Sequence, residues 1–202
     1  MKRSSLLFGL ILTVACSFAL VPAVLAQADE TPSMSPAAAK QIIQNRARQV
    51  ILAIQAKNMN QLANYVHPTK GVRFSSYSYV DKDGDLVFRP AQVRDLGTSK
   101  RRYHWGEYDG SGDPIRMTFD RYYREFVYDK NFARAPEIRY NEISGGGTII
   151  INIFSSYPGA IVVDHYFPPT EGEMDWRSLR LAFQKRGSVW YLVGIIHNEW
   201  TI

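Results

Sequence analysis

A strand, a turn and a second strand near the C-terminus constrain the fold of this chain more than any other segment. Residues 179–184 alternate between large apolar side chains and polar or small ones, as expected for a half-solvated strand. The turn-forming segment 185–188 follows, and residues 189–196 are apolar on both faces, which indicates a central strand. Gly194 within that run predicts a bulge or bend. We therefore expect a sheet built around the last strand.

Nearer the N-terminus the hydrophobic spacing is that of helices. Apolar residues recur three and four positions apart over residues 37–56, which predicts an amphipathic helix of about five turns. Ser35 is a suitable N-cap, with Pro36 at the first helical position. Asn58 can cap a second, short helix, which must end before Pro68 because proline disfavours a helical conformation in the residue before it.

The middle of the chain carries further strand signals. Strands are expected over residues 71–80, 86–88, 148–154 and 160–167, with a short one around Ile138. The segment 81–85 (DKDGD) is a hairpin turn, Thr118 can cap another short helix, and residues 91–114 are expected to be irregular. This order predicts a single α+β domain over residues 35–202, with N-terminal helices packed on one face of a curved, cone-like antiparallel sheet.

The first 26 residues have the layout of a cleavable signal peptide. Two basic residues precede an apolar run over 6–25, and small side chains lead to a cleavage site between Ala26 and Gln27. Residues 27–34 are polar and small, and are expected to form a disordered lead-in. We therefore expect an exported protein, either periplasmic or secreted.

Two alternatives to this cleavage are open. The apolar run is long enough to span a membrane, but Pro22 and the small residues at the cut favour removal, so the mature protein is not expected to span a membrane. A lipid anchor on Cys16 is disfavoured because residues 13–15 lack the expected leucine and residues 17–25 stay apolar. Cys16 is the only cysteine, so its removal excludes disulfides, thiol catalysis and cysteine-bound zinc.

The net charge and the aromatic content indicate which kinds of ligand or partner to expect. Loss of the first 26 residues lowers the net charge from +5 to +3, which does not suggest a nucleic-acid-binding protein. The 12 Tyr, 10 Phe and 4 Trp favour a β-rich core, with an aromatic ligand cavity as the alternative. The sequence has no cofactor-binding motif, so we expect no bound cofactor.

Three segments carry a resemblance to known proteins: 67–75 (HPTKGVRFS), 105–112 (WGEYDGSG) and 190–197 (WYLVGIIH). They resemble segments of a group of exported bacterial proteins to which no activity is assigned. The order of elements resembles the nuclear-transport-factor-two-like superfamily, a cone-shaped α+β fold. This resemblance implies a pocket between a curved sheet and its helices, but the same fold serves enzymes, binding proteins and scaffolds.

Few residues are candidates for chemistry. Asp164 and Tyr166 share one face of the expected strand and His165 the other, so Asp164 suits acid–base work if it faces a pocket. The alternative for Asp164 is an outer-face carboxylate beside a basic side chain. His67, at a corner before a proline, is a second weak catalytic candidate, or else it bonds to the backbone. The residues proposed to line a binding pocket are Tyr122, Asp164, Tyr166 and Trp190.

Metal binding is not expected. His197 and Glu199 have the same parity on the last strand, but no third ligand and no HExxH spacing accompany them. The acidic segments 81–85 and 109–113 have the composition of calcium loops, but the glycine and glutamate positions of an EF-hand are not met after Asp81. Both segments are therefore interpreted as turns.

The sequence favours an exported, non-enzymatic domain that binds a small molecule, a peptide or a protein. Two alternatives stay open. One is an enzyme for a small substrate, an isomerase, dehydratase or hydrolase that uses Asp164 or His67. The other is an envelope-associated scaffold that forms a homodimer through an apolar patch on the outer face of its sheet.

Overall fold

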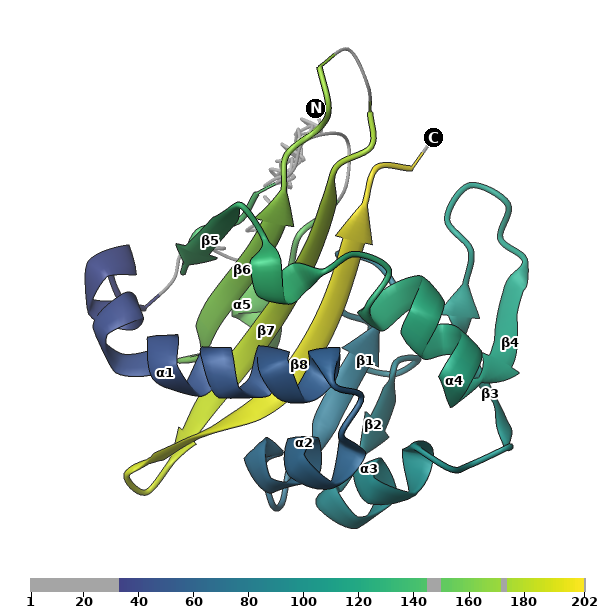
Figure 1. The fold of residues 1–202 in the computed structure, drawn as a ribbon, viewed down its shortest axis with the longest axis horizontal. Helices are drawn as coiled ribbons and strands as arrows, with labels where there is room; N and C mark the ends of the chain where they lie inside the picture. Colours follow the sequence, from purple (N-terminus) through teal and green to yellow (C-terminus); the bar gives the residue numbers. More distant parts are fainter. Residues whose placement is uncertain (1–32, 145–149, 172–173, 202) are drawn as a thin grey trace, which may run out of the picture.

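The computed structural model describes residues 33–144, 150–171 and 174–201, and these form an α+β fold (Figure 1). The helices are α1 (Pro36–Gln55), α2 (Met59–Tyr65), α3 (Pro90–Leu96), α4 (Phe119–Tyr122) and α5 (Ile153–Ser156), with a π-helical turn over Tyr123–Val127 and a 3-10 turn over Phe132–Arg134. The strands are β1 (Val72–Ser75), β2 (Leu86–Phe88), β3 (Arg102–Glu107), β4 (Pro114–Thr118), β5 (Glu137–Tyr140), β6 (Ile161–Phe167), β7 (Arg177–Arg186) and β8 (Val189–Glu199).

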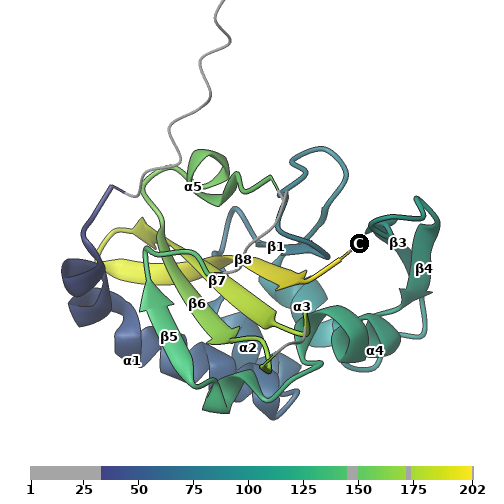
Figure 2. The ribbon, with the colours of Figure 1, turned by 90° about the horizontal axis from the view of Figure 1, so that it is seen from above.

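Six strands form the main sheet, in the order β2-β1-β8-β7-β6-β5. The last strand, β8, lies inside this sheet, as its apolar sequence predicted. All neighbours pair antiparallel except β1 and β8, which are parallel, so the sheet is mixed rather than purely antiparallel. The sheet is not strongly curled, and the expected cone-like curvature is not confirmed (Figure 2).

The predicted irregularity at Gly194 is present as a bulge between β7 and β8. Ala182 pairs with Gly194 and Phe183 pairs with Leu192, so Val193 is an extra residue on β8. A methyl group at position 194 would lie 2.7 Å from the Tyr157 hydroxyl, so any larger residue would force the neighbouring side chains to shift.

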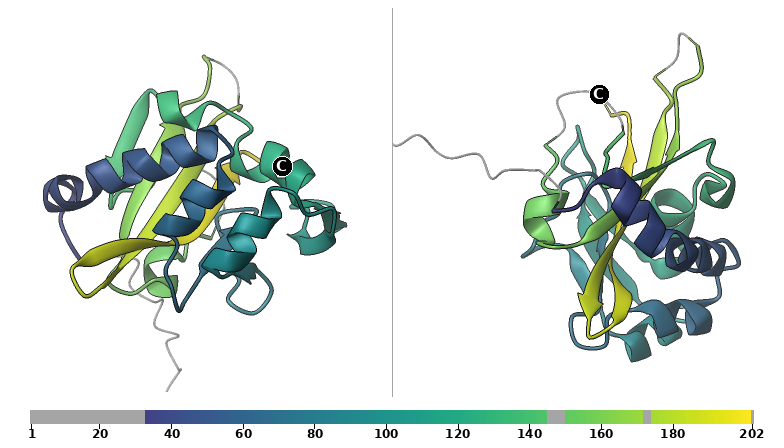
Figure 3. Two further views of the ribbon diagram at one scale, coloured as in Figure 1. Left: turned by 60° about the horizontal axis from the view of Figure 1, so that its bottom comes forward. Right: turned by 90° about the vertical axis from the view of Figure 1, so that its left-hand side faces the viewer.

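Helix α1 covers one face of the sheet, as its hydrophobic spacing predicted (Figure 3). Ser35 caps the helix by accepting a hydrogen bond from the backbone N–H of Ala38 at 3.4 Å. The helix buries its apolar stripe, which includes Ile43, Val50 and Ile54, in the main hydrophobic core. Packed side chains thus fill the space between helix and sheet, where the family resemblance implied a pocket.

The opposite face of the sheet is also covered, which corrects the expectation of a half-solvated strand. Arg180 and Ala182 have no exposed surface, and Gln184 is buried as well. A second apolar cluster forms here, to which α5 contributes Ile153, and Figure 2 shows α5 on the side away from α1. Among the described residues, the outer face of β7 is therefore packed rather than solvated, and the dimeric scaffold stays a prediction.

Other local expectations are corrected as well. Residues 153–154 lie in α5 and not in a strand, while residues 148–149 lie outside the described residues. The first strand stops at Ser75 and does not continue to residue 80. Residues 91–114 are not irregular, since they contain most of α3 and all of β3.

The hairpin between β1 and β2 is confirmed, with Phe74 opposite Leu86. The signal peptide, its cleavage site at Ala26 and Gln27, and the anchor alternative at Cys16 lie outside the described residues, as does most of the lead-in. Within the part of the chain that the structure describes, no helix has both the length and the apolar character needed to cross a membrane.

Candidate functional site

His67 is a structural histidine at its corner. It is buried, and its Nδ1 accepts hydrogen bonds from the backbone N–H groups of Lys70 (3.0 Å) and Thr69 (3.3 Å). Burial, with the charges of Lys70 and Arg186, lowers the pKa of His67, which keeps the ring in the neutral form that can accept. These contacts agree with the alternative given for His67 above, that it forms hydrogen bonds with the backbone rather than acting in catalysis.

Asp164 faces away from α1 and is fully buried. Its Oδ1 accepts from the Ser178 hydroxyl (2.5 Å), and its Oδ2 accepts from the Ser144 backbone N–H (2.8 Å). Arg180 lies beside it, with Nε 3.7 Å from Oδ2, and donates to the Ser144 carbonyl (2.6 Å) and the Ser78 hydroxyl (2.8 Å). Asp164 is therefore a carboxylate beside a basic side chain, in a site closed to solvent.

The predicted binding residues do not converge on one cavity. Tyr122 is fully buried with its ring stacked on Trp105 at 3.8 Å between centroids. Tyr166 is buried near Trp176 and under the guanidinium of Arg139, while Trp190 packs against the main core. Tyr122 contacts Trp105 and Ser76, two residues that line a pocket, and supports its wall from behind.

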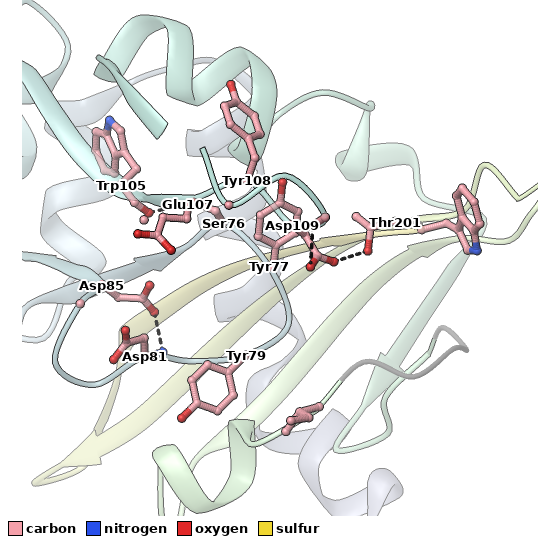
Figure 4. Close-up of a pocket in the computed structure, with 16 residues that line it drawn as sticks. Ser76, Tyr77, Tyr79, Asp81, Asp85, Trp105, Glu107, Tyr108, Asp109 and Thr201 are labelled. Carbon is pink, nitrogen blue, oxygen red and sulfur yellow. Dashed lines mark hydrogen bonds between the residues drawn. The ribbon is translucent and has the colours of Figure 1, made fainter. Parts of the chain in front are cut away.

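The best-formed pocket of the described residues lies beside the sheet rather than under α1 (Figure 4). It has a volume of about 770 Å³, within the range of sites for small ligands. Its walls are the loop between β1 and β2, the turn between β3 and β4, and the residues after β8. The lining residues are Ser76, Tyr77, Tyr79, Asp81, Gly84, Asp85, Trp105, Gly106, Glu107, Tyr108, Asp109, Gly110, Gly112, Ile150, Trp200 and Thr201.

Asp85 is the most buried carboxylate of this pocket. Its Oδ2 accepts from the Ser75 hydroxyl (2.5 Å) and from the backbone N–H of Asp81 (3.1 Å). Burial raises the pKa of Asp85 to about 6, although these two hydrogen bonds and the charge of Arg73 oppose the shift. Asp85 can therefore change its charge close to neutral pH.

A bulge in β3 sets the direction of Glu107. The register with β4 shifts between His104 and Glu107, and Gly106 adopts a φ of 110°, which favours glycine. In a regular strand Glu107 would point the same way as the buried Trp105. The bulge instead places it on the exposed face of the strand, where it lines the pocket.

Aromatic stacking supports the pocket wall from behind. The Trp105 indole donates to the Met117 carbonyl (3.0 Å), and the Ser76 hydroxyl donates to the Trp105 carbonyl (3.1 Å). The Tyr108 hydroxyl, on the β3–β4 turn, donates to Glu125 (2.6 Å). Burial is the main cause that raises the pKa of Tyr108 to about 12, and the hydrogen bond to Glu125 adds to it. The pocket is thus held by side chains that are fixed by their own hydrogen bonds.

Sequence reasoning missed this site although its signals were visible. The segments 81–85 and 109–113 were interpreted as turns, and they are turns. The first also contributes Asp81 and Asp85 to the pocket wall, and the second contributes Asp109. Trp105, in one of the segments that carried the family resemblance, forms another part of the wall. Because turn residues far apart in sequence meet only through the fold, no local pattern could join them.

His197 and Glu199 point to the same side of β8, as their parity predicted. His197 Nε2 lies 3.2 Å from Asp129, and Arg177 bridges Asp129 (3.1 Å) and Glu199 (2.8 Å). Burial by itself would raise the pKa of Asp129, but the contacts with His197 and Arg177 outweigh it and hold this pKa below its usual range. Within the described ranges no three His, Cys, Asp or Glu side chains are placed to hold a metal ion.

Comparisons with known proteins add no relative: no family model, curated protein or solved structure matches this chain.

Proposed function

We propose that this protein is an exported binding domain that holds a small molecule in the pocket between the β1–β2 loop and the β3–β4 turn. The observation that carries the proposal is the pocket itself, about 770 Å³ with walls of aromatic and acidic side chains. A cavity of this size with apolar walls and a few polar groups is the usual form of a small-molecule site.

The exposure of two wall residues adds support to the proposal. Tyr79 keeps 53% of its surface exposed. Ile150, another wall residue, is 69% exposed. Large apolar side chains held open to solvent beside polar groups are typical of a surface that a ligand covers. Export remains a prediction from the first 26 residues.

The catalytic alternative is disfavoured for the two residues first considered. Asp164 is closed to solvent, and the acceptor nitrogen of His67 is occupied by backbone donors. Within the pocket, Asp85 has the pKa of about 6 that acid–base chemistry would require. An enzyme for a small substrate is therefore the second candidate, with Asp85 as its acid or base, and loss of turnover in Asp85→Asn would be its signature.

Tryptophan indole signals can test the binding proposal. The chain has 4 Trp, of which Trp105 and Trp200 line the pocket and Trp176 and Trp190 do not. The full chain is expressed in an exporting bacterial host, and the purified protein's N-terminus is read by mass spectrometry. Mixtures of cationic, neutral and anionic fragments are then added, and the indole N–H resonances are followed by NMR.

We expect fragments to shift the Trp105 and Trp200 signals and leave the other two in place. Tyr79→Ala should weaken these shifts, whereas Ile138→Ala, which removes a 45% exposed side chain outside the pocket, should not. Shifts confined to Trp176 and Trp190, or no shifts with any fragment, would contradict the proposal.

A further inference from the structure

We infer that the ligand of this pocket is a small organic cation, a molecule with an ammonium, amidinium or guanidinium group. The inference rests on the proposed function and adds the chemical class of the ligand. It follows from the charge of the pocket wall, the partners of each carboxylate and the kind of aromatic surface beside them.

The pocket wall carries four carboxylates and no basic side chain. These are Asp81, Asp85, Glu107 and Asp109, which come from both of the acidic turns and from the end of β3. Among the described residues, each ion pair involves other carboxylates, and none of these four has a basic partner within 4 Å. The wall is therefore a region of negative potential on a chain with a net charge of +5.

The neighbours of these carboxylates are mainly neutral donors. Asp109 accepts from the Thr201 hydroxyl and from the backbone N–H of Gly110. Asp81 accepts from the backbone N–H of Asp83 at 3.0 Å. Neutral donors fix the position of a carboxylate, but they leave its charge for a ligand to balance.

Arg73 is a basic side chain next to the β1–β2 loop, and it offsets only part of this charge. Its guanidinium donates to the backbone carbonyls of Asp81 (2.8 Å) and Asp85 (3.0 Å) and does not line the pocket. It lowers the pKa of Asp85 less than burial raises it. Glu107 and Asp109 lie on the opposite wall, at the β3–β4 turn (Figure 4).

Aromatic rings share the pocket with these carboxylates. The aromatic side chains of the lining that are at least partly exposed are Tyr77, Tyr79, Tyr108 and Trp200, and Figure 4 shows tyrosines on both the loop and the turn. The Trp105 ring is buried against Tyr122 and supports the wall from behind. The π-face of an aromatic ring attracts a cation and does not attract an anion. Carboxylates together with aromatic rings therefore favour a ligand that is both positively charged and partly apolar.

Anionic and neutral ligands fit this wall less well. An anion would meet several negative charges, which Arg73 offsets only in part, and no basic side chain lines the pocket. A neutral ligand would displace water from the ionised carboxylates without balancing their charge, and this desolvation is unfavourable. A cation removes both penalties, since it supplies hydrogen-bond donors and the opposite charge at the same time.

Three compounds of one shape and different charge provide the test. Benzamidine is a cation near neutral pH, benzamide is its neutral analogue and benzoate is an anion. Each is titrated in phosphate buffer, which contains no competing amine, and the Trp105 and Trp200 indole signals report binding. We expect benzamidine to bind on the order of 10-fold more tightly than benzamide, with benzoate weakest, and added salt to reduce the difference.

A matched pair of variants locates the charge effect. Glu107→Gln keeps the size of an exposed pocket side chain and should weaken benzamidine binding roughly 2- to 5-fold without affecting benzamide. Glu142→Gln makes the same change at an exposed position outside the pocket and should leave both affinities unchanged.

The outcomes separate the inference from the proposed function. Equal binding of benzamide and benzamidine at the two pocket tryptophans, or tighter binding of benzoate, would overturn the cationic ligand but keep the binding site. If neither the three compounds nor the fragment mixtures move these signals, the binding function fails and the inference fails with it.

Discussion

Asp164 and Arg180 face each other across strands β6 and β7, with 3.7 Å between Oδ2 and Nε and no exposed surface on either side chain. Removing one charge of a buried pair leaves the other without compensation. We expect Asp164→Asn to lower the free energy of unfolding by about 3–5 kcal/mol, measured by urea denaturation.

Two further variants check that burial is the cause of this loss. Glu137→Gln breaks an ion pair with Arg139 in which both side chains are exposed, Glu137 to 38% and Arg139 to 40%. It should lower the free energy of unfolding by less than about 1 kcal/mol. Replacing the buried pair by Asp164→Leu with Arg180→Met should recover much of the stability lost in Asp164→Asn. A small effect of Asp164→Asn, similar to that of Glu137→Gln, would argue against a structural role.

Acid should destabilise the fold through His165. Burial lowers the pKa of His165 to about 4, only partly opposed by the Phe132 backbone, whereas the ordinary value is 6.5. The folded state thus prefers the neutral ring. The neutral His165 ring therefore contributes stability that is complete above pH 6.5 and is lost as the pH falls through 4. The total loss in the free energy of unfolding is about 3 kcal/mol.

His165→Leu removes this titration, so the stability gap between variant and wild type should change by that amount between pH 7 and pH 4. Urea denaturation across this range measures it. His104→Gln, at an exposed histidine, should follow the wild-type profile. Parallel profiles for wild type and His165→Leu would show that His165 does not control the acid response.

Ligand affinity should depend on pH through Asp85. Because the pKa of Asp85 is raised to about 6, its carboxyl group gains a proton and loses its charge as the pH falls from 7.5 to 5. Benzamidine binding should weaken over this range while benzamide binding stays constant. The indole signals of Trp105 and Trp200 give both affinities. In Asp85→Asn the benzamidine affinity should be lower at pH 7.5 and nearly independent of pH.

Gly194→Ala should destabilise the sheet. The added methyl would lie 2.7 Å from the Tyr157 hydroxyl and 2.9 Å from Ile196 Cδ1. Such overpacking costs about 1–3 kcal/mol, which thermal unfolding would detect as a lower midpoint. Shortening the facing side chain in Gly194→Ala with Tyr157→Leu should cost less than the two single changes added together. Additive costs would mean that the clash with Tyr157 is not the cause.

Local patterns predicted much of the secondary structure because they act over a few residues. The amphipathic spacing over 37–56 gave the position of α1 to within one residue at each end, since the helix runs from Pro36 to Gln55. The turn-forming residues at 81–85 gave the hairpin, and Gly194 marked the bulge in β8. The same reasoning failed at residues 153–154, where β-forming side chains lie in a short helix.

The candidate site shows where local reasoning stops. Tyr122 was chosen as an aromatic residue of a short helix, and it lies behind the pocket wall rather than on it. Asp164 was correctly assigned to one face of its strand, but periodicity alone does not say what covers that face. Contacts with Ser144, Ser178 and Arg180 turned a possible catalytic carboxylate into a buried structural one.

The sequence by itself determined the α+β class, the long N-terminal helix and the central place of β8, because hydrophobic period and turn chemistry are properties of neighbouring residues. Only the tertiary structure decided that both faces of the sheet are covered and that two acidic turns and the end of β8 enclose one pocket. Asp85 and Glu107 lie 22 positions apart in sequence, and the fold places them on one cavity. Contacts between such distant segments form only when the whole chain packs, so no local pattern encodes them.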